Sequence, residues 1–187
     1  MKSTPEQQYL WQQQRHDQIE TWLDLLELRA GSVLADFGCG PGYASLLALS
    51  RVGGQGLVYA IDRSQAMIDY LRRLIEEQQL QGIEPVCSDV TEDLQLDPAP
   101  DAVLIANMLH HTSKLQAVIH QAGRVLKKNG KLLIVEFDPE GPAPFGPPRS
   151  MRLPADKVFA ALKEEAMVVL SQGRTPPDWY YVLAAHA

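Results

Sequence analysis

Three glycines at alternate positions, placed after an apolar run and an acidic residue, constrain this chain more than any other feature. The run reads Val33-Leu-Ala-Asp36-Phe-Gly38-Cys-Gly40-Pro-Gly42. Glycine is favoured where the backbone takes a conformation that a side chain forbids, and where a ligand approaches the main chain closely. The pattern therefore predicts a buried strand that turns sharply into a helix around a ligand.

The spacing of these glycines separates two classes of nucleotide ligand. In a dinucleotide-binding fingerprint they fall as G-x-G-x-x-G, and the pyrophosphate lies against the N-terminus of the helix. Here Tyr43 occupies the third glycine position of that pattern. Asp36 would repel a pyrophosphate and attract an ammonium or a sulfonium, both of which S-adenosylmethionine carries. A glycine-rich turn without a ligand is the alternative interpretation.

These residues resemble motif I of the class I (Rossmann-like) S-adenosylmethionine-dependent methyltransferases, in which an acidic residue precedes G-x-G-x-G. The resemblance covers residues 30–187, and two further segments extend it. Asn107-Met-Leu-His110-His111 is similar to the N-x-L-H-H of many members that act on small molecules. The loop from Glu136 to Pro148 resembles that of the UbiE-like and type 11 members, and its Phe145 would offer an aromatic face. The resemblance implies a three-layer αβα sandwich whose seven-stranded, mostly parallel sheet contains one antiparallel strand.

Hydrophobic periodicity predicts the same order of elements, because strand and helix patterns alternate along the chain. Strands are expected at 33–37, 57–61, 84–87, 102–106, 131–137, 167–171 and 180–185, and helices at 43–51, 65–79, 114–127 and 155–165. One continuous helix is expected through residues 9–26, and a proline-rich loop at 138–154. We therefore expect residues 1–29 to form a helical lid on a methyltransferase domain at residues 30–187.

The composition is typical of a globular domain. The chain has 187 residues, of which 45% are hydrophobic and 21% charged, and this suits one globular domain. A formal net charge of −6 argues against nucleic acid as a partner, and no apolar run approaches the length of a membrane span. The first eight residues lack the apolar core of a secretory signal, so a cytoplasmic protein is expected, as a monomer or a homodimer.

The two cysteines, Cys39 and Cys87, are too few and too poorly spaced to predict a zinc site. No metal is therefore expected. A structural disulfide is not expected in a reducing compartment either. Cys39 lies inside the glycine loop and would react if it were exposed.

Acidic and polar residues follow four of the predicted strands, and the carboxyl ends of parallel strands meet at one edge of a sheet. Asp62 comes twenty positions after Gly42 and would accept hydrogen bonds from both ribose hydroxyls. Asp89 would accept from the adenine amine, with a turn cap as the alternative. The resemblance implies that Asp36 reaches the methionine amino group through water or the backbone, and that Asn107 meets the methionine portion.

The remaining expected cofactor contacts come from the glycine loop and from the segments after the second and third strands. They are Phe37, Gly38, Cys39, Gly40, Gly42, Arg63, Met67 and Val90. Met67 would pack on the adenine ring, with plain core packing as the alternative.

Methyl transfer is an in-line displacement, so alignment of the acceptor and exclusion of water are the main requirements. His110 and His111 are the candidate bases for a small-molecule acceptor that must lose a proton, with a purely structural role as the alternative. Two other functions remain open at this point. One is a catalytically silent S-adenosylmethionine-binding protein, and the other is an NAD-dependent oxidoreductase.

Overall fold

The computed structural model describes residues 3–142 and 146–187, so the expected contact of Phe145 lies outside the described residues. Seven strands form one sheet in the order β3-β2-β1-β4-β5-β7-β6. Strand β7 runs antiparallel to both of its neighbours, and the other described pairs are parallel. The expected seven-stranded sheet with one antiparallel strand is therefore confirmed.

Strands and helices alternate along most of the chain as expected, with longer connections from β3 to β4 and from β5 to α6. The strands are β1 (Val33–Phe37), β2 (Leu57–Asp62), β3 (Ile83–Cys87), β4 (Ala102–Ala106), β5 (Lys131–Phe137), β6 (Met167–Thr175) and β7 (Trp179–His186). The α-helices are α1 (Pro5–Gln13), α2 (His16–Leu25), α3 (Tyr43–Val52), α4 (Gln65–Gln78), α5 (Leu115–Val125) and α6 (Ala155–Glu164). Short 3-10 turns occupy Gly53–Gln55, Leu109–His111 and Arg149–Met151.

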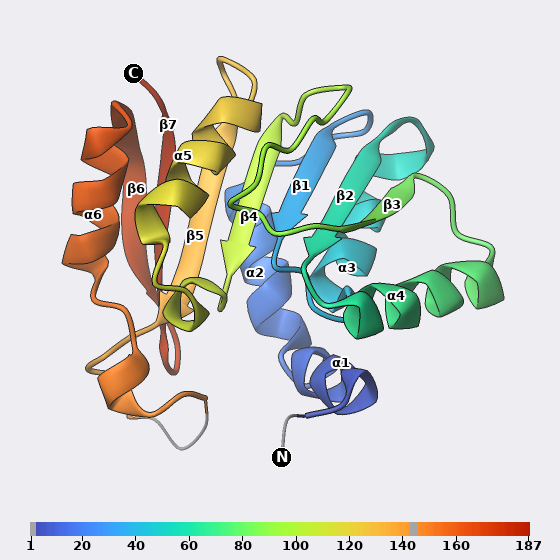
Figure 1. Cartoon of the computed structure of the whole chain (residues 1–187), viewed down its shortest axis with the longest axis horizontal. Coiled ribbons are helices and arrows are strands. Elements are labelled where there is room, and N and C mark those ends of the chain that lie inside the picture. Colours follow the sequence, from blue (N-terminus) through green and yellow to red (C-terminus); the bar gives the residue numbers. More distant parts are fainter. Residues whose placement is uncertain (1–2, 143–145) are drawn as a thin grey trace.

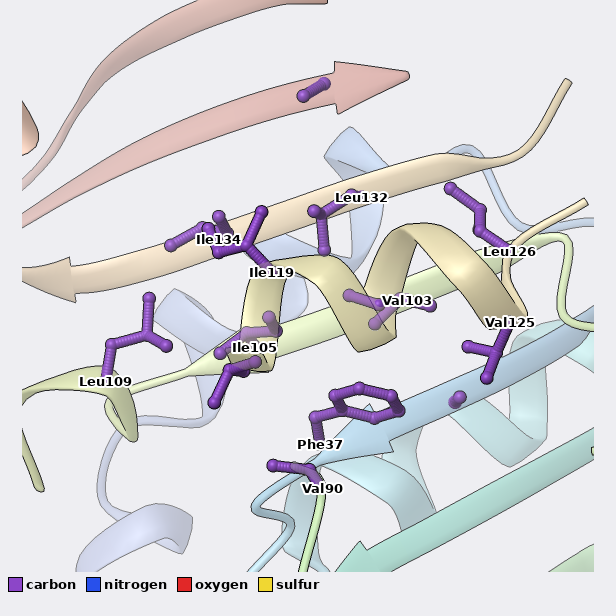
Figure 2. Packing of buried hydrophobic residues seen from close by; sticks show 14 of the residues in the cluster. Phe37, Val90, Val103, Ile105, Leu109, Ile119, Val125, Leu126, Leu132 and Ile134 are labelled. Carbon is purple, nitrogen blue, oxygen red and sulfur yellow. The ribbon is translucent and has the colours of Figure 1, made fainter. Parts of the chain in front are cut away.

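Helices cover both faces of the sheet and produce two main hydrophobic clusters. In Figure 2, α5 lies over β4 and β5, and its Ile119 and Val125 pack near Phe37 of β1 and Ile105 of β4. On the other face, Trp22 of α2 belongs to the cluster that includes α3. The central strands are buried from both sides, which explains why they read as continuous apolar runs.

The segment before β1 is the main correction to the sequence prediction. Instead of one continuous helix there are two, with a break at Gln14 and Arg15, where Arg15 has φ −112° and ψ 27°. Helix α2 packs against the sheet through Ile19, Trp22 and Leu23. Helix α1 lies beyond the carboxyl ends of β1, β2 and β4 (Figure 1). One straight helix could not bury the apolar side of both segments.

The last two strands are longer than predicted. Strand β6 continues through Thr175, which pairs with Trp179, so the connection between the two predicted strands shrinks to a short turn. Strand β6 is also an edge of the sheet, and Val168, Val169 and Leu170 are exposed there, next to an irregular register between Val169 and Ser171.

Candidate cofactor and acceptor site

A cavity of about 1190 Å³ lies between residues of α1 and the segments that follow the central strands. Its wall combines the glycine loop, the segments after β2, β3 and β4, residues of α1 and α2, and the loop after β5. The lining includes Gln8, Trp11, Gln12, Arg15, Trp22, Gly38, Gly40, Asp62, Arg63, Met67, Asp89, Val90, Asn107, His110, His111, Phe137 and Pro147. The expected meeting of strand-end residues at one edge of the sheet is therefore observed.

The glycine loop needs glycine at its two ends. Gly38 has φ +74°, and a Cβ atom there would overlap the side chain of Met108. Gly42 has φ +89°, and its Cβ would lie 2.6 Å from Cδ1 of Leu71 in α4. The loop thus bends in the left-handed region at positions where neighbouring side chains leave no room for a substituent.

Asp62 ends β2 and is held by backbone amides on both carboxylate oxygens. Oδ2 accepts from the Gly40 amide at 2.9 Å, and Oδ1 accepts from the Ser64 amide at 2.8 Å. A carboxylate has about four acceptor positions, so these two bonds orient the group and still leave acceptor capacity. Because Asp62 also lines the cavity, it can bind a pair of hydroxyl groups there.

Asp89 takes part in a turn and also faces the cavity. Its Oδ1 accepts from the amide and from the hydroxyl of Thr91, both at 2.9 Å. The hydrogen bond from the Thr91 amide lowers the pKa of Asp89, which keeps the group ionised. Arg63, Met67 and Val90 lie in the same part of the wall. The turn interaction is therefore present, and it is compatible with a ligand contact.

Four of the expected residues lie behind the cavity wall. Phe37 is fully buried in the core beneath α5 (Figure 2), and Gly42 supports the start of α3 against Leu71. Cys39 is 2% exposed, and burial raises its pKa well above the usual value, so its thiol is neutral and shielded. Asp36 is also buried. Its Oδ2 accepts from the Ser45 hydroxyl at 2.6 Å, and burial raises its pKa to about 7.

Asn107 adopts a left-handed backbone with φ +54° directly after β4. Its amide donates to Val135 at 2.9 Å, and its side-chain Oδ1 accepts from the Trp179 indole at 2.9 Å. The side chain is therefore bound to β7 on one side, while the residue lines the cavity.

His110 and His111 lie next to each other in the turn after β4, with ring centroids 4.0 Å apart. His110 Nδ1 lies 2.7 Å from Oε2 of Glu136, and both side chains are almost fully buried. His111 is more exposed. Partial burial, and then the nearby His110, lower the pKa of His111. The two histidines therefore differ in environment, and His110 has the carboxylate partner.

Sequence reasoning did not identify Glu136 as a site residue. A signal was present, because Glu136 interrupts the apolar run of β5 near its carboxyl end, as Asp62 does in β2. An acidic side chain at such a position needs a partner once it is buried.

Gln12 of α1 was also missed. Its Nε2 donates to the Cys39 carbonyl at 3.4 Å, and its Oε1 accepts from the Tyr43 amide at 3.1 Å. The amide at the start of α3, which a dinucleotide fingerprint would direct to a pyrophosphate, is therefore used by a side chain of α1. Sequence reasoning could not single out Gln12, because several glutamines lie close together in this segment. Only the position of α1 in the structure shows which of them contacts the glycine loop.

Aromatic groups line the side of the cavity formed by α1, α2 and β5. Trp11 and Phe137 have ring centroids 6.3 Å apart, and the Arg15 guanidinium lies 3.6 Å from the Trp11 centroid. Nη1 of Arg15 donates to the Trp11 carbonyl at 2.6 Å. Trp22 lines the same region. This part of the cavity suits a flat or apolar molecule.

Comparison with known proteins decides the family. The model of the methyltransferase-domain family matches residues 34–130, which is more than half of the chain. The chain belongs to this family. It is a class I S-adenosylmethionine-dependent methyltransferase by sequence and fold, as motif I indicated.

Two curated relatives and one solved structure illustrate the likeness. A demethylmenaquinone methyltransferase of Bacillus mycoides is 26% identical over 112 residues, which are 60% of this chain and 47% of that protein. The biotin biosynthesis bifunctional protein BioHC of Saccharophagus degradans is 32% identical over 108 residues, 57% of this chain and 18% of that protein. This methyltransferase therefore spans less than half the length of either relative.

The solved structure is a SAM dependent methyltransferase from Aquifex aeolicus, with a TM-score of 0.82 and 24% identity over 89% of this chain and 88% of that one. This likeness shows the fold. The cavity fits the cofactor of the family, because carboxylates fixed at strand ends suit hydroxyl and ammonium groups, whereas the amide at the start of α3 is already bonded. S-adenosylmethionine is accordingly the cofactor. Within the described residues, no helix combines the length and apolar character that crossing a membrane requires.

Proposed function

We propose that this protein transfers the methyl group of S-adenosylmethionine to a small-molecule acceptor held in the same cavity. The observation that carries the proposal is that a single cavity is lined by fixed carboxylates, by His110 and by aromatic groups. Its volume of about 1190 Å³ exceeds the roughly 300–1,000 Å³ of a pocket for one drug-sized ligand, which leaves room for two molecules.

The proposed cofactor contacts follow from the wall of the cavity. Asp62 would accept from the ribose hydroxyls and Asp89 from the adenine amine, while Met67 and Val90 pack on the ring beside Arg63. Residues of the glycine loop and Asn107 would surround the methionine portion. Asp36 would act from behind the wall, through the backbone or water, because its side chain is buried beside Ser45.

Bound S-adenosylmethionine supplies a methyl group on a sulfonium, which is displaced in line with a neutral leaving group. The protein has to align the acceptor and exclude water, and alignment is worth about 7–11 kcal/mol in favourable intramolecular systems. His110 and His111 are the proposed bases for an acceptor that loses a proton. Trp11, Trp22 and Phe137 favour an apolar or aromatic acceptor, as the name of the demethylmenaquinone relative also suggests.

We further propose that residues 1–29 act as a lid, since side chains of α1 and α2 line the cavity. A cytoplasmic location, a monomeric or homodimeric state and the absence of a nucleic-acid partner remain proposals. They are supported by the net charge of −6 and the composition of the chain.

The test is isothermal titration with S-adenosylmethionine and S-adenosylhomocysteine, followed by transfer of a radiolabelled methyl group to a panel of small aromatic and apolar acceptors. Binding of both ligands and labelling of at least one acceptor are expected. Binding without any transfer would favour a silent binding protein. No binding of either ligand, together with retention of NAD, would overturn the proposal.

A further inference from the structure

The carboxylate of Glu136 is buried at the end of β5, just outside the cavity. The side chain has no exposed surface, and each oxygen has a defined partner. Oε1 accepts from the Leu109 amide at 2.6 Å, and Oε2 lies 2.7 Å from Nδ1 of His110. Burying a carboxyl group costs free energy unless its oxygens are hydrogen-bonded, and these two contacts offset that cost.

This contact determines which nitrogen of His110 carries the proton. An ionised carboxylate only accepts hydrogen bonds, so Nδ1 of a neutral His110 must be the donor. The Leu109 amide donates to the other oxygen, Oε1, so Oε2 is the oxygen that faces Nδ1 of His110. The remaining ring nitrogen, Nε2, then carries a lone pair. His110 lines the cavity, and Nε2 is the ring nitrogen that is not bonded to Glu136.

Other ionisable groups surround the pair. His111 lies in the same turn, Arg63 approaches from the segment after β2, and Tyr180 and Asp138 approach from β7 and from the end of β5. Burial, and then the charges of Glu136 and Asp138, raise the pKa of Tyr180, so the phenol stays neutral. The ring of Phe137 packs edge-on against His110, with centroids 5.7 Å apart.

We infer that Glu136 is a positioning residue that holds His110 as a neutral base with Nε2 toward the acceptor, and that the acceptor is a hydroxyaromatic compound. This inference rests on the proposed function. A phenol has a pKa of about 10, close enough to that of imidazole, about 6.5, for proton transfer during the reaction. An acceptor without a dissociable proton would not need this pair. The aromatic wall formed by Trp11, Trp22 and Phe137 suits a flat ring.

The proposed transfer conserves atoms and charge. The acceptor hydroxyl gives its proton to Nε2 of His110, and an electron pair of the hydroxyl oxygen forms the new bond to the methyl carbon. The electron pair of the broken carbon–sulfur bond stays on sulfur. The products are an aryl methyl ether, neutral S-adenosylhomocysteine and an imidazolium whose charge Glu136 offsets, and the imidazolium later releases its proton to water.

The first test reads the tautomer without any acceptor. Nitrogen-15 NMR of the imidazoles is recorded in the complex with S-adenosylhomocysteine, and the His110 signals are assigned by their loss in His110→Ala. The wild type is expected to show a protonated Nδ1 and an unprotonated Nε2. In Glu136→Gln the amide can donate to Nδ1, so the protonated nitrogen should switch to Nε2. Glu164→Gln, at an exposed carboxylate of α6, should change nothing.

A protonated Nε2 in the wild type would overturn the inference, and so would the same tautomer in the wild type and Glu136→Gln. The affinity for S-adenosylhomocysteine and the melting temperature of each variant are measured in parallel. Equal values show that the change is not a loss of fold. Failure of the wild type to bind the ligand would instead refute the proposed function, so the two failures are distinguishable.

The second test addresses the acceptor. Transfer is measured to a set of naphthols and to quinoline, a ring system of matched size whose nitrogen has no proton to lose. Transfer to at least one naphthol is expected, with a loss of about 10²–10⁴-fold in Glu136→Gln and none in Glu164→Gln. Transfer to quinoline alone, or to neither class, would overturn the assignment of the acceptor, as would undiminished transfer to naphthols in Glu136→Gln.

Discussion

Asp62 shows how a single side chain is prepared for a ligand before the ligand binds. Two backbone amides hold its carboxylate, one from the glycine loop and one from the start of α4. This orientation lowers the cost of ordering the group when a cofactor binds. Sequence reasoning could place Asp62 at the end of its strand, next to the cavity, because an acidic residue at the end of a buried strand is a strong signal.

We expect Asp62→Ala to weaken the binding of S-adenosylhomocysteine by roughly 100-fold or more. Two hydrogen bonds to a charged acceptor are lost, each worth about 1.5–3 kcal/mol. Titration calorimetry measures the change, and circular dichroism checks that the variant is folded. Asp69→Ala, at an exposed carboxylate of α4, is the matched control. Equal affinity in the two variants would remove Asp62 from the site.

At the level of elements, α1 and the glycine loop form one unit. Gln12 bonds to the loop on both sides of Gly40, and Tyr9 of α1 packs edge-on against Tyr43 of α3, with centroids 5.2 Å apart. His16 adds a contact from Nδ1 to the Tyr43 hydroxyl at 3.0 Å. These contacts are what would hold the proposed lid against the glycine loop and α3.

We expect Gln12→Ala to release S-adenosylhomocysteine about tenfold faster than the wild type. Each lost hydrogen bond contributes about 0.5–1.5 kcal/mol, and one factor of ten corresponds to about 1.4 kcal/mol. Stopped-flow tryptophan fluorescence can follow the release, because Trp11 and Trp22 line the cavity. Gln13→Ala, at an exposed position of the same helix, should behave like the wild type. Identical rates for both variants would contradict the role of Gln12.

Gly42 joins the loop to α3, and Gly42→Ala is expected to lower the free energy of unfolding by about 1–3 kcal/mol. The cause is its φ of +89° together with the contact that a Cβ would make with Leu71. Urea denaturation measures the loss. Gly54→Ala, where a Cβ meets nothing within 4 Å, should stay within about 0.5 kcal/mol of the wild type. A loss of similar size in both variants would contradict this explanation.

The elements that sequence reasoning recovered are those with a strong local signal. Strands β1, β2, β4 and β5 are buried on both faces and read as apolar runs, and their ends carry the polar residues that meet at the cavity. The break at Arg15 has no such signal, because it reflects the different surfaces on which α1 and α2 pack. For the same reason the partners of Gln12 and His110 could not be predicted, since they depend on tertiary contacts between distant segments.

At the scale of the whole molecule, the buried carboxyl group of Asp36 makes stability depend on pH. Its pKa rises from 3.8 to about 7 on folding, mainly through burial. Between these values the folded state binds the proton more strongly than the unfolded state does. The free energy of unfolding should therefore fall as the pH rises from about 4 to about 7, by up to about 4 kcal/mol from this group.

We expect Asp36→Asn to remove this dependence, because the amide stays neutral and can still accept from the Ser45 hydroxyl. Without ligand, the variant should match the wild type near pH 4 and exceed its stability at pH 8. Chemical denaturation across this range, with Asp69→Asn as the control, measures the difference. A constant gap between Asp36→Asn and the wild type from pH 5 to pH 8 would contradict the prediction.

Strand β6 carries a practical consequence for handling the protein. It ends the sheet and leaves Val168, Val169 and Leu170 in contact with water. The unpaired backbone groups of an edge strand can pair with a strand of another molecule, and exposed apolar side chains there favour aggregation at high concentration. The irregular register beside Val169 offers some protection by bending the strand. A lysine in place of Val169 is the natural first change for a preparation that precipitates on concentration.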